Sequence, residues 1–403
     1  MKLLRLQAQN CRNLEPFVHQ PSAGLNFFIG PNAQGKTSIL EAIHLVATLE
    51  SFREKDLEFV IRSGQHTAEV GADVGFENEQ GAWQTSLGIR LERDEHRIQR
   101  RLKKTAFRDH KPAKRVSEYR RSRFHTIVFN PADHDLIRGE PRGRRTFLNR
   151  VVCAEELEYG DILKRYQKAL EQRNALLRQI SQGILSREAA GLAEFSRQIA
   201  AYGAQIIYLR ALWLGKLAKT INSALQRIAP EQEKLEVKYH ASIPLFEEEK
   251  VSENNRLFGE TFSGQGLDAS LELLEKRLEI RLSRFRERET AAGVTLVGPH
   301  REDWMFESRQ MPLSHRGSQG EIRSALLALK ISEMDLYETR SQVKPVLLLD
   351  DFSSELDLKR REFLLGRLRE SGVQGFVTTT EEQSFRRLHP EIQSFDVVNG
   401  TIS

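Results

Sequence analysis

The feature that most constrains this chain is a glycine-spaced turn between an apolar strand and an apolar-periodic helix. The turn comprises Gly30, Pro31, Asn32, Ala33, Gln34, Gly35, Lys36, Thr37 and Ser38. An expected strand at 25–29 precedes it, and apolar residues recur at helical spacing over 39–49. Two bracketing glycines let successive backbone N–H groups turn inward on an anion, and the following helix adds its positive N-terminal end. The pattern predicts a Walker A loop, in which Lys36 reaches the β- and γ-phosphates and the Thr37 hydroxyl ligates Mg²⁺.

Composition narrows the class of protein. The chain has 403 residues, of which 39% are hydrophobic and 29% charged, so we expect two folded domains or one domain with a large insertion. The apolar runs are too short to cross a bilayer and no signal-peptide pattern follows Met1, so we expect a cytoplasmic protein with no membrane partner. Cys11 and Cys153 lack metal-ligand spacing and are expected to be reduced thiols.

A basic run at 97–123 is compatible with an anionic polymer, such as a nucleic acid, as a binding partner. Lysine and arginine dominate this run, opposed only by Asp109 and Glu118, and the pI of the chain is about 9.1. A solvated basic hairpin and a phosphate-contacting surface both fit the pattern, because phosphate contacts need cations clustered on one face. The candidate DNA contacts are Arg100, Arg101, Lys103 and Lys104.

The middle of the chain has helical periodicity. Apolar residues at heptad spacing predict one helix up to a break near Gly183 and a second from Leu192 onward, joined as an antiparallel hairpin. A third helix is expected over 267–285. Because Arg173 interrupts the first apolar seam, we favour packed helices of a globular lobe over a long coiled coil. The stretch 231–266 has a mixed pattern and stays unassigned.

The last third returns to short strands. Strands at 294–297 and 304–306 are expected to form a hairpin, and a helix is expected to begin near Ser318. The apolar strand 345–349 ends in Asp350 and Asp351, a Walker B pattern. We expect Asp350 to hold Mg²⁺ and Asp351 to act catalytically with Lys36, by orienting or deprotonating the attacking water.

Together these motifs resemble the ABC-type head ATPases, including SMC proteins, and within them the bacterial RecF family. The resemblance is carried by 10–14, 30–42, 131–148, 172–177, 298–301, 318–323 and 348–357. It implies an α/β fold, an ABC-type ATPase head with a mixed β-sheet and flanking helices, and an inserted helical lobe. The head would comprise 1–130 and 292–403, and the helical lobe 131–291.

The resemblance also implies a function. ATP and Mg²⁺ would be bound by the Walker residues, by Arg12 and Asn13, and by the signature Ser318, Gln319, Gly320 and Glu321 of a second copy. ATP would thus drive homodimerisation, and weak DNA-dependent hydrolysis would reverse it. Similar proteins act on double-stranded DNA and single-strand/double-strand junctions in repair and the SOS response, and with RecR and RecO they help RecA to load on single-stranded DNA.

The sequence departs from the family pattern at several positions, among them 131–134, and three other classes of protein compete with this resemblance. Glu321 stands where RecF proteins usually have Gln, and 378–380 lacks the switch histidine of ABC transporters. A transporter subunit would carry its two Walker motifs closer together, with a Leu-Ser-Gly-Gly-Gln signature. A nuclease-coupled ATPase would need a further domain after the Walker B motif, and a long-armed SMC protein a much longer helical insertion.

Overall fold

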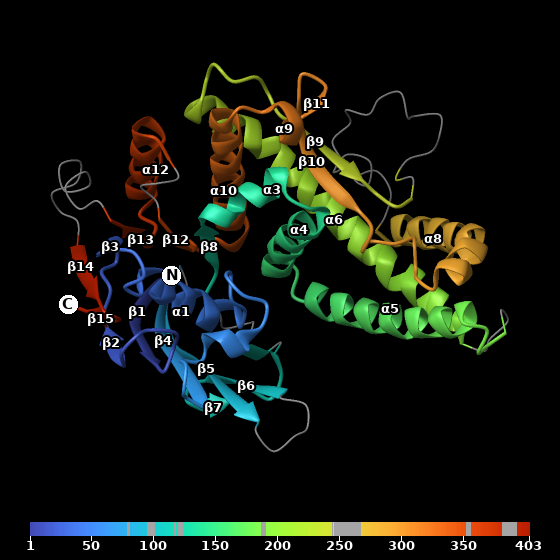
Figure 1. The fold of residues 1–403 in the computed structure, drawn as a ribbon. Coiled ribbons are helices and arrows are strands. Elements are labelled where there is room, and N and C mark those ends of the chain that lie inside the picture. The colour runs from blue at the N-terminus through green and yellow to red at the C-terminus, as the bar shows by residue number, and fades with distance from the viewer. Residues whose placement is uncertain are drawn as a thin grey trace. The chain divides into compact units, whose positions relative to one another are not determined.

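The computed structural model describes residues 1–78, 81–94, 101–116, 118–119, 124–186, 191–243, 245, 267–351, 356–380 and 393–403. The chain packs into two units (Figure 1): unit 1 is Met1–Asp133 with Glu333–Ser403, and unit 2 is His134–Ser332. The expected head included 292–332, which belongs to unit 2 in the structure. The physical reason is strand pairing, because β10 (Asp303–Ser308) pairs with β9 (Glu236–His240) inside unit 2.

An antiparallel sheet forms one layer of unit 1. In spatial order its described strands are β2 (Phe17–His19), β1 (Lys2–Gln9), β4 (Thr67–Asn78), β5 (Gly81–Asp94), β6 (Arg101–Arg108) and β7 (Lys111–Pro112). Burial alternates along β4, where Ala68, Val70, Ala72 and Val74 are buried. This period of two is typical of a sheet that covers a core with one face only.

A second, largely parallel sheet carries the two Walker motifs. In spatial order its described strands are β15 (Thr401–Ile402), β14 (Gln393–Val398), β3 (Leu25–Ile29), β13 (Gly375–Thr379), β12 (Val346–Leu349) and β8 (Thr126–Phe129). The strands predicted at 25–29, 345–349 and 376–380 are confirmed within one residue at each end. Because β3, β13 and β12 run parallel, their carboxyl ends meet at one edge, where ligands of such sheets bind.

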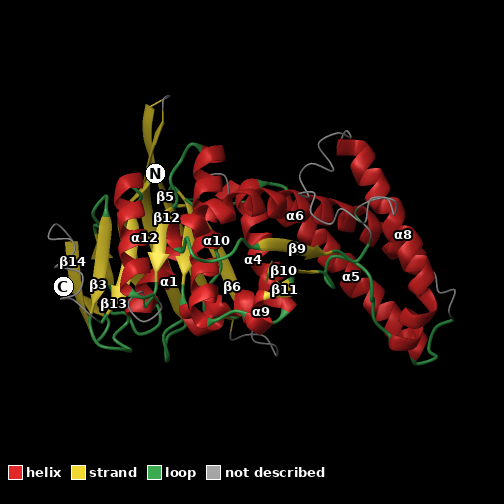
Figure 2. Cartoon of the chain, turned by 90° about the horizontal axis from the view of Figure 1, so that it is seen from above, coloured by secondary structure: helices red, strands yellow, loops and turns green. Residues whose placement is uncertain are grey.

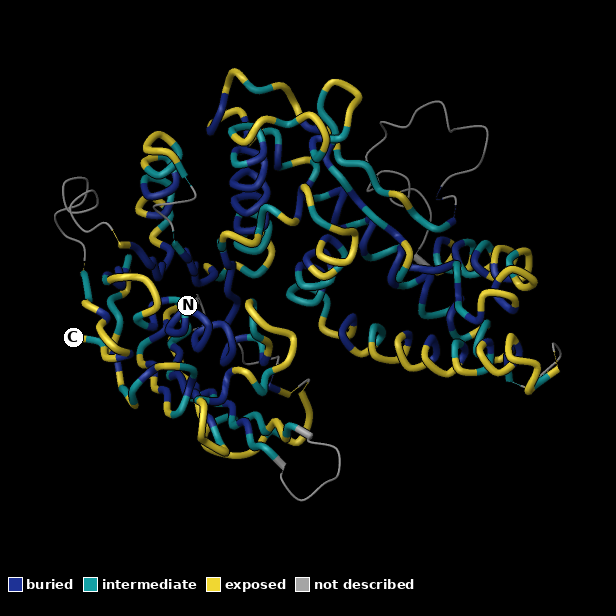
Figure 3. The backbone as a smooth tube through the Cα atoms, viewed as in Figure 1, coloured by how far each residue is buried: buried dark blue, intermediate teal, exposed yellow. Residues whose placement is uncertain are grey.

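Helix α1 (Lys36–Thr48) belongs to a hydrophobic core shared by both sheets. Its residues from Ile39 to Ala47 are almost all fully buried (Figure 3), and the same cluster includes Leu6 of β1, Phe28 of β3 and Leu348 of β12. Unit 1 also contains the 3-10 helix η1 (Leu57–Val60) and helix α12 (Leu358–Ser371). This core fixes the loop before α1 to the edge of the parallel sheet.

Unit 2 is mainly helical (Figure 2). Its long helices are α4 (Pro141–Glu155), α5 (Tyr159–Ser181), α6 (Leu192–Ile228) and α8 (Leu267–Ala292). The shorter elements are α3 (Asp135–Arg138), β11 (Met311–Pro312) and α9 (Leu313–Arg316). Along the chain, η2 (Pro131–His134) contains the boundary after Asp133, and α10 (Gln319–Ser341) contains the boundary after Ser332. The predicted helix pair is confirmed, since α6 packs on α5 and turns back along it (Figure 1). No helix in the described ranges is long and apolar enough to span a membrane.

The strand predicted at 294–297 is wrong. These residues form no strand, and β10 pairs with β9 and β11 instead. Two backbone amides of this segment bond to side chains rather than to a neighbouring strand. Thr295 N donates to Asn174 Oδ1 at 2.8 Å, and Leu296 N donates to Glu289 Oε1 at 2.8 Å. Satisfied amides do not need a sheet partner.

Candidate functional site

A cavity of about 920 Å³ opens in unit 1 at the carboxyl edge of the parallel sheet. Among the predicted site residues it brings together Arg12, Asn13, Asn32, Ala33, Gly35, Lys36, Thr37, Ser38, Asp350 and Asp351. The two Walker motifs, separated by more than 300 residues in sequence, therefore line one cavity. The strand order β3-β13-β12 is what brings them together.

The loop backbone requires glycine at both of its ends. Gly30 has φ +156°, and a Cβ there would lie 2.3 Å from the carbonyl oxygen of Val397. Gly35 has φ +109° and packs against Leu14 and Gly400. The loop is also tied to the C-terminal strands, because Gln34 accepts hydrogen bonds from the amides of Asn399 and Gly400. Gln34 therefore fixes the loop to the turn between β14 and β15.

Lys36 lies folded over the loop. Its ammonium donates to the carbonyl oxygens of Gly30 at 2.6 Å and Pro31 at 2.7 Å. Burial lowers the pKa of Lys36, although Asp351 and Asp350 nearby act in the opposite direction. A bound phosphate would offer this cation stronger acceptors than two carbonyls, because hydrogen bonds between charged groups are the stronger ones.

A compact polar cluster joins the two Walker motifs. Thr37 Oγ1 donates to Asp350 Oδ1 at 2.8 Å, and Thr378 Oγ1 donates to the same oxygen at 2.8 Å. Thr378 also accepts from the amide of Asp351 at 2.8 Å. Burial raises the pKa of Asp350 against the effect of these hydrogen bonds. Asp351 has φ +47°, a sparsely populated conformation for a residue with a side chain.

The cluster fits a magnesium ion. Mg²⁺ takes one or two carboxylates and completes its shell with water and substrate phosphates, and Thr37 and Asp350 offer one hydroxyl and one carboxylate side by side. No group of three or more His, Cys, Asp or Glu side chains that could hold a metal occurs in the part of the chain that the structure describes. One hydroxyl and one carboxylate would leave the rest of the Mg²⁺ shell to water and phosphate oxygens.

Arg12 and Asn13 brace the loop. Arg12 makes a bidentate ion pair with Glu41, at 2.8 Å for each bond, and Glu41 also pairs with Arg53 at 3.5 Å. Asn13 Nδ2 donates to Ala33 O at 3.1 Å, and Ser38 Oγ donates to Asn13 Oδ1 at 3.0 Å. Because Glu41 is fully buried on α1, it fixes two arginines at the cavity wall.

Sequence reasoning assigned no role to several residues of this site. Missed lining residues are Arg53, Phe59, Ile61, Arg62, Ser63, Arg93 and Thr378, and Glu41 supports the wall from behind. They come from segments that carry no phosphate-binding motif. Only the strand order could have indicated Thr378. Because β13 lies between β3 and β12, the carboxyl end of β13 lies between the two Walker motifs.

The signature segment lies at the start of α10. Ser318 N donates to Glu321 Oε2 at 2.8 Å, and Glu321 N donates to Ser318 Oγ at 3.2 Å. This reciprocal pair is a capping box, which satisfies two amides at a helix start. Hydrogen bonding to Ser318 lowers the pKa of the Glu321 carboxyl. Ser318 and Gln319 are exposed, so this helix start is accessible within unit 2.

The candidate DNA contacts are only partly described. Arg100 lies outside the described residues, and Arg101 is described by its backbone alone. Ser354 and Glu355, which follow the Walker B motif, also lie outside the described residues. Lys103 pairs with Glu92 at 2.8 Å, and Lys104 Nζ donates to Leu49 O at 3.0 Å. The assignment of these residues to DNA stays a prediction.

The fold and the site define an ABC-type ATPase head. Solved structures of similar fold include the SMC head bound to the C-winged helix domain of ScpA, at 13% identity and a TM-score of 0.53, covering 100% of this chain and 97% of that one. A greater likeness is to the recombination mediator protein RecF with ATP in the RecFOR pathway, at 28% identity and a TM-score of 0.81, covering 100% of this chain and 96% of that one.

Sequence comparisons give the family. Residues 2–403 match the family described as RecF/RecN/SMC N terminal domain. The DNA replication and repair protein RecF of Symbiobacterium thermophilum is 33% identical over 408 residues, covering 100% of this chain and 98% of that protein. The RecF protein of Enterococcus faecalis is 32% identical over 403 residues, with the same two coverages. The chain belongs to the RecF family of DNA replication and repair proteins, and the predicted family and fold class are both confirmed.

Proposed function

We propose that the unit 1 cavity binds ATP with Mg²⁺. The observation that carries the proposal is the hydrogen-bonded cluster of Thr37, Asp350 and Thr378 beside the loop that ends in Lys36. Lys36 would hold the β- and γ-phosphates, and Thr37 and Asp350 would hold Mg²⁺, which neutralises phosphate charge when it is bound. Similar RecF proteins have been solved with ATP and ATPrS, which supports the assignment.

Asp351 is the proposed catalytic carboxylate. It follows the metal-binding Asp350 directly, lines the same cavity, and its backbone is held by Thr378. A carboxylate in this place can orient or deprotonate the water that attacks the γ-phosphate. We propose slow hydrolysis, which acts as a timer for release rather than as a motor.

ATP would act as the link of a symmetric homodimer. The Walker residues of one copy would hold the triphosphate, and the start of α10 of a second copy, from Ser318 to Glu321, would meet the γ-phosphate with N–H groups and a hydroxyl. A helix start is a favourable place for an anion. In a two-fold arrangement both copies would contribute in the same way, so two ATP molecules would close one interface.

The closed dimer would bind DNA mainly through phosphates, at duplexes and single-strand/double-strand junctions. The family's role in DNA replication and repair supports DNA as the partner. Two similar solved structures are described as those of the recombination mediator protein RecF in the RecFOR pathway. We therefore propose RecR and RecO as partners of this chain, with RecA loading as the step they promote, and a cytoplasmic location.

Ser318→Arg tests the dimer. The added side chain would block the approach of a γ-phosphate to α10, while ATP binding in unit 1 needs no residue of α10. We expect normal ATP affinity and loss of ATP-dependent dimerisation, measured by light scattering. Gln182→Arg, an exposed position at the end of α5, is the control with the same change of charge and should dimerise normally. Dimers of Ser318→Arg at wild-type levels would refute the role of the signature.

A further inference from the structure

The cavity extends beyond the part that a triphosphate would fill. Its lining includes Lys36, Thr37 and Asp350 of the Walker motifs, and also Phe59, Ile61, Arg62, Ser63 and Arg93 from other segments. Phosphate binding does not explain the part lined by these five residues, which we call the second end. Its volume, about 920 Å³ for the whole cavity, is within the range of small-molecule sites, roughly 300–1,000 Å³.

Phe59 is exposed where a core residue would be buried. Its exposed fraction is 61%, whereas the next two residues, Val60 and Ile61, are 0% and 3% exposed. The hydrophobic core therefore takes Val60 and Ile61 and leaves the ring of Phe59 at the cavity. A large apolar side chain held out of the core is the unusual observation, because burying an aromatic ring is favourable.

The backbone that carries Phe59 is fixed to the segment just after β1 that carries Arg12. Arg12 N donates to Val60 O at 2.8 Å, and Arg62 N donates to Asn10 O at 2.9 Å. An isolated bridge between Cys11 and Ile61 lies between these two bonds. Since Asn13 in turn bonds to the Walker loop through Ala33, the ring stands at a fixed position relative to the phosphate-binding end.

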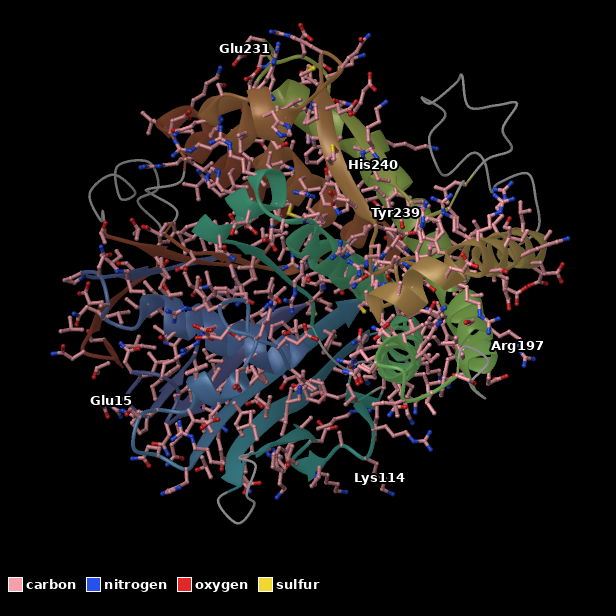
Figure 4. The ribbon with its side chains drawn as sticks, turned by 45° about the vertical axis from the view of Figure 1, so that its right-hand side comes forward. Glu15, Lys114, Arg197, Glu231, Tyr239 and His240 are labelled. Atoms are coloured by element: carbon pink, nitrogen blue, oxygen red, sulfur yellow. The ribbon has the colours of Figure 1, made fainter. Side chains whose placement is uncertain are left out.

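The cations at this end are already paired within the protein. Arg62 forms an ion pair with Glu15, which Figure 4 labels on the surface of unit 1, and Arg93 pairs with Glu58 at 3.3 Å. Paired cations attract a further phosphate only weakly. The second end thus has an aromatic side chain and arginines whose charge is already balanced by glutamates. A flat, uncharged ring fits such a surface better than an anion does.

We propose that Phe59 is the base-binding residue of the nucleotide site, with the adenine ring of ATP stacked on its side chain. The proposal rests on the proposed binding of ATP and adds the residue that recognises the nucleoside half. Stacking on an aromatic ring is effective for any base, because every base has a π-face. Phe59 therefore contributes affinity for a nucleotide over a bare polyphosphate.

The test compares ATP with inorganic tripolyphosphate, both with Mg²⁺, by calorimetric titration. For Phe59→Ala we expect ATP to bind roughly tenfold more weakly and tripolyphosphate to bind as it does to the wild type. Phe59→Trp keeps a stacking surface and should bind ATP like the wild type. Trp83→Ala removes another exposed aromatic, 48% exposed and outside the cavity, and should change neither affinity.

Unchanged ATP affinity in Phe59→Ala, or equal weakening of both ligands, would overturn the proposal. Lys36→Ala separates this result from the function of the site as a whole, because it should weaken ATP and tripolyphosphate alike. If wild-type protein binds neither ligand, the nucleotide-binding function itself fails, and the base-binding role fails with it.

Discussion

Thr378 connects the two carboxylate residues that follow β12. Its single hydroxyl donates to Asp350 and accepts from the amide of Asp351. The positive φ of Asp351 has an energetic cost of about 1–3 kcal/mol, and the bond from its amide to Thr378 helps to hold that conformation. One small side chain on β13 thus sets the position of the proposed metal ligand and of the proposed catalytic group.

In unit 2, the surroundings of His300 keep its ring neutral. Its Nε2 lies 3.1 Å from the carbonyl oxygen of Thr295, to which it must donate, and its Nδ1 lies 2.7 Å from the Tyr166 hydroxyl. Burial lowers the pKa of His300 to about 4, and the nearby Arg301, Arg145 and Arg173 act in the same direction. The neutral ring is the folded form.

This pKa predicts acid sensitivity of unit 2. The unfolded state takes up a proton on His300 near pH 6.5 and the folded state only near pH 4, so the free energy of unfolding should fall as the pH drops through this window. The loss attributable to His300 is roughly 3 kcal/mol at most. Urea unfolding at several pH values measures it. His300→Gln should remove this part of the slope, and an unchanged slope would contradict the assignment.

Residues of the site were predictable where the motif is local. Lys36 and Thr37 follow from spacing within the loop, and Asp350 follows from its place after an apolar strand. Glu41 and Phe59 were not predictable as site residues, because neither belongs to a phosphate-binding pattern. Their roles depend on contacts with Arg12 and with 10–12, which only the folded chain brings close.

Among the elements, α5 is joined to α8 by a buried ion pair. Arg173 on α5 donates to Glu289 Oε2 at 2.7 Å and to Thr295 Oγ1 at 2.8 Å, and both charged side chains are almost fully buried. Arg173 also donates to Ser196 on α6 at 3.0 Å. The residue that interrupts the apolar seam of α5 therefore ties three helices and the segment after α8 together.

Removing one partner of this pair should destabilise unit 2. Arg173→Met leaves Glu289 as an unpaired buried charge, and we expect a loss of about 3–5 kcal/mol in the free energy of unfolding. Urea unfolding followed by the fluorescence of Trp213 and Trp304, both buried in unit 2, measures it. The double variant Arg173→Met/Glu289→Leu should recover most of the loss.

Arg197→Met is the matched control for this prediction. Arg197 pairs with Glu194 at 3.0 Å on the surface of α6, with side-chain exposures of 68% and 53%, so its loss should cost less than about 1 kcal/mol. If Arg173→Met unfolds at the urea concentration of this control, the buried pair does not hold the helices together.

Sequence patterns predicted elements well where periodicity decides the structure. The helices α5, α6 and α8 and the strands β3, β12 and β13 follow from apolar spacing. The segment 294–297 has a strand-like composition, yet its amides bond to Asn174 and Glu289. Side chains more than a hundred residues away in sequence, such as Asn174, cannot be foreseen from a local pattern. A distant partner also fixes a side chain of β9. Tyr239, which Figure 4 labels beside His240, donates a hydrogen bond to Glu302, a residue far from it in sequence.

At the scale of the whole molecule, each proposed ATP site is formed by two copies of the chain, and each copy contributes one half. The Walker motifs and Phe59 lie in unit 1, and the signature lies in unit 2 at the start of α10. ATP would then control whether two copies close, and closure would control DNA binding. The affinity for DNA should therefore depend on which nucleotide is bound.

The most direct measurement is fluorescence anisotropy of gapped, duplex and single-stranded DNA titrated with the protein. Each DNA is tested with ATP, with ADP and without nucleotide, at one salt concentration, because phosphate contacts are salt-dependent. We predict tight binding of duplex or gapped DNA with ATP and clearly weaker binding with ADP or no nucleotide. Equal affinities in all three nucleotide states would contradict the ATP-driven clamp.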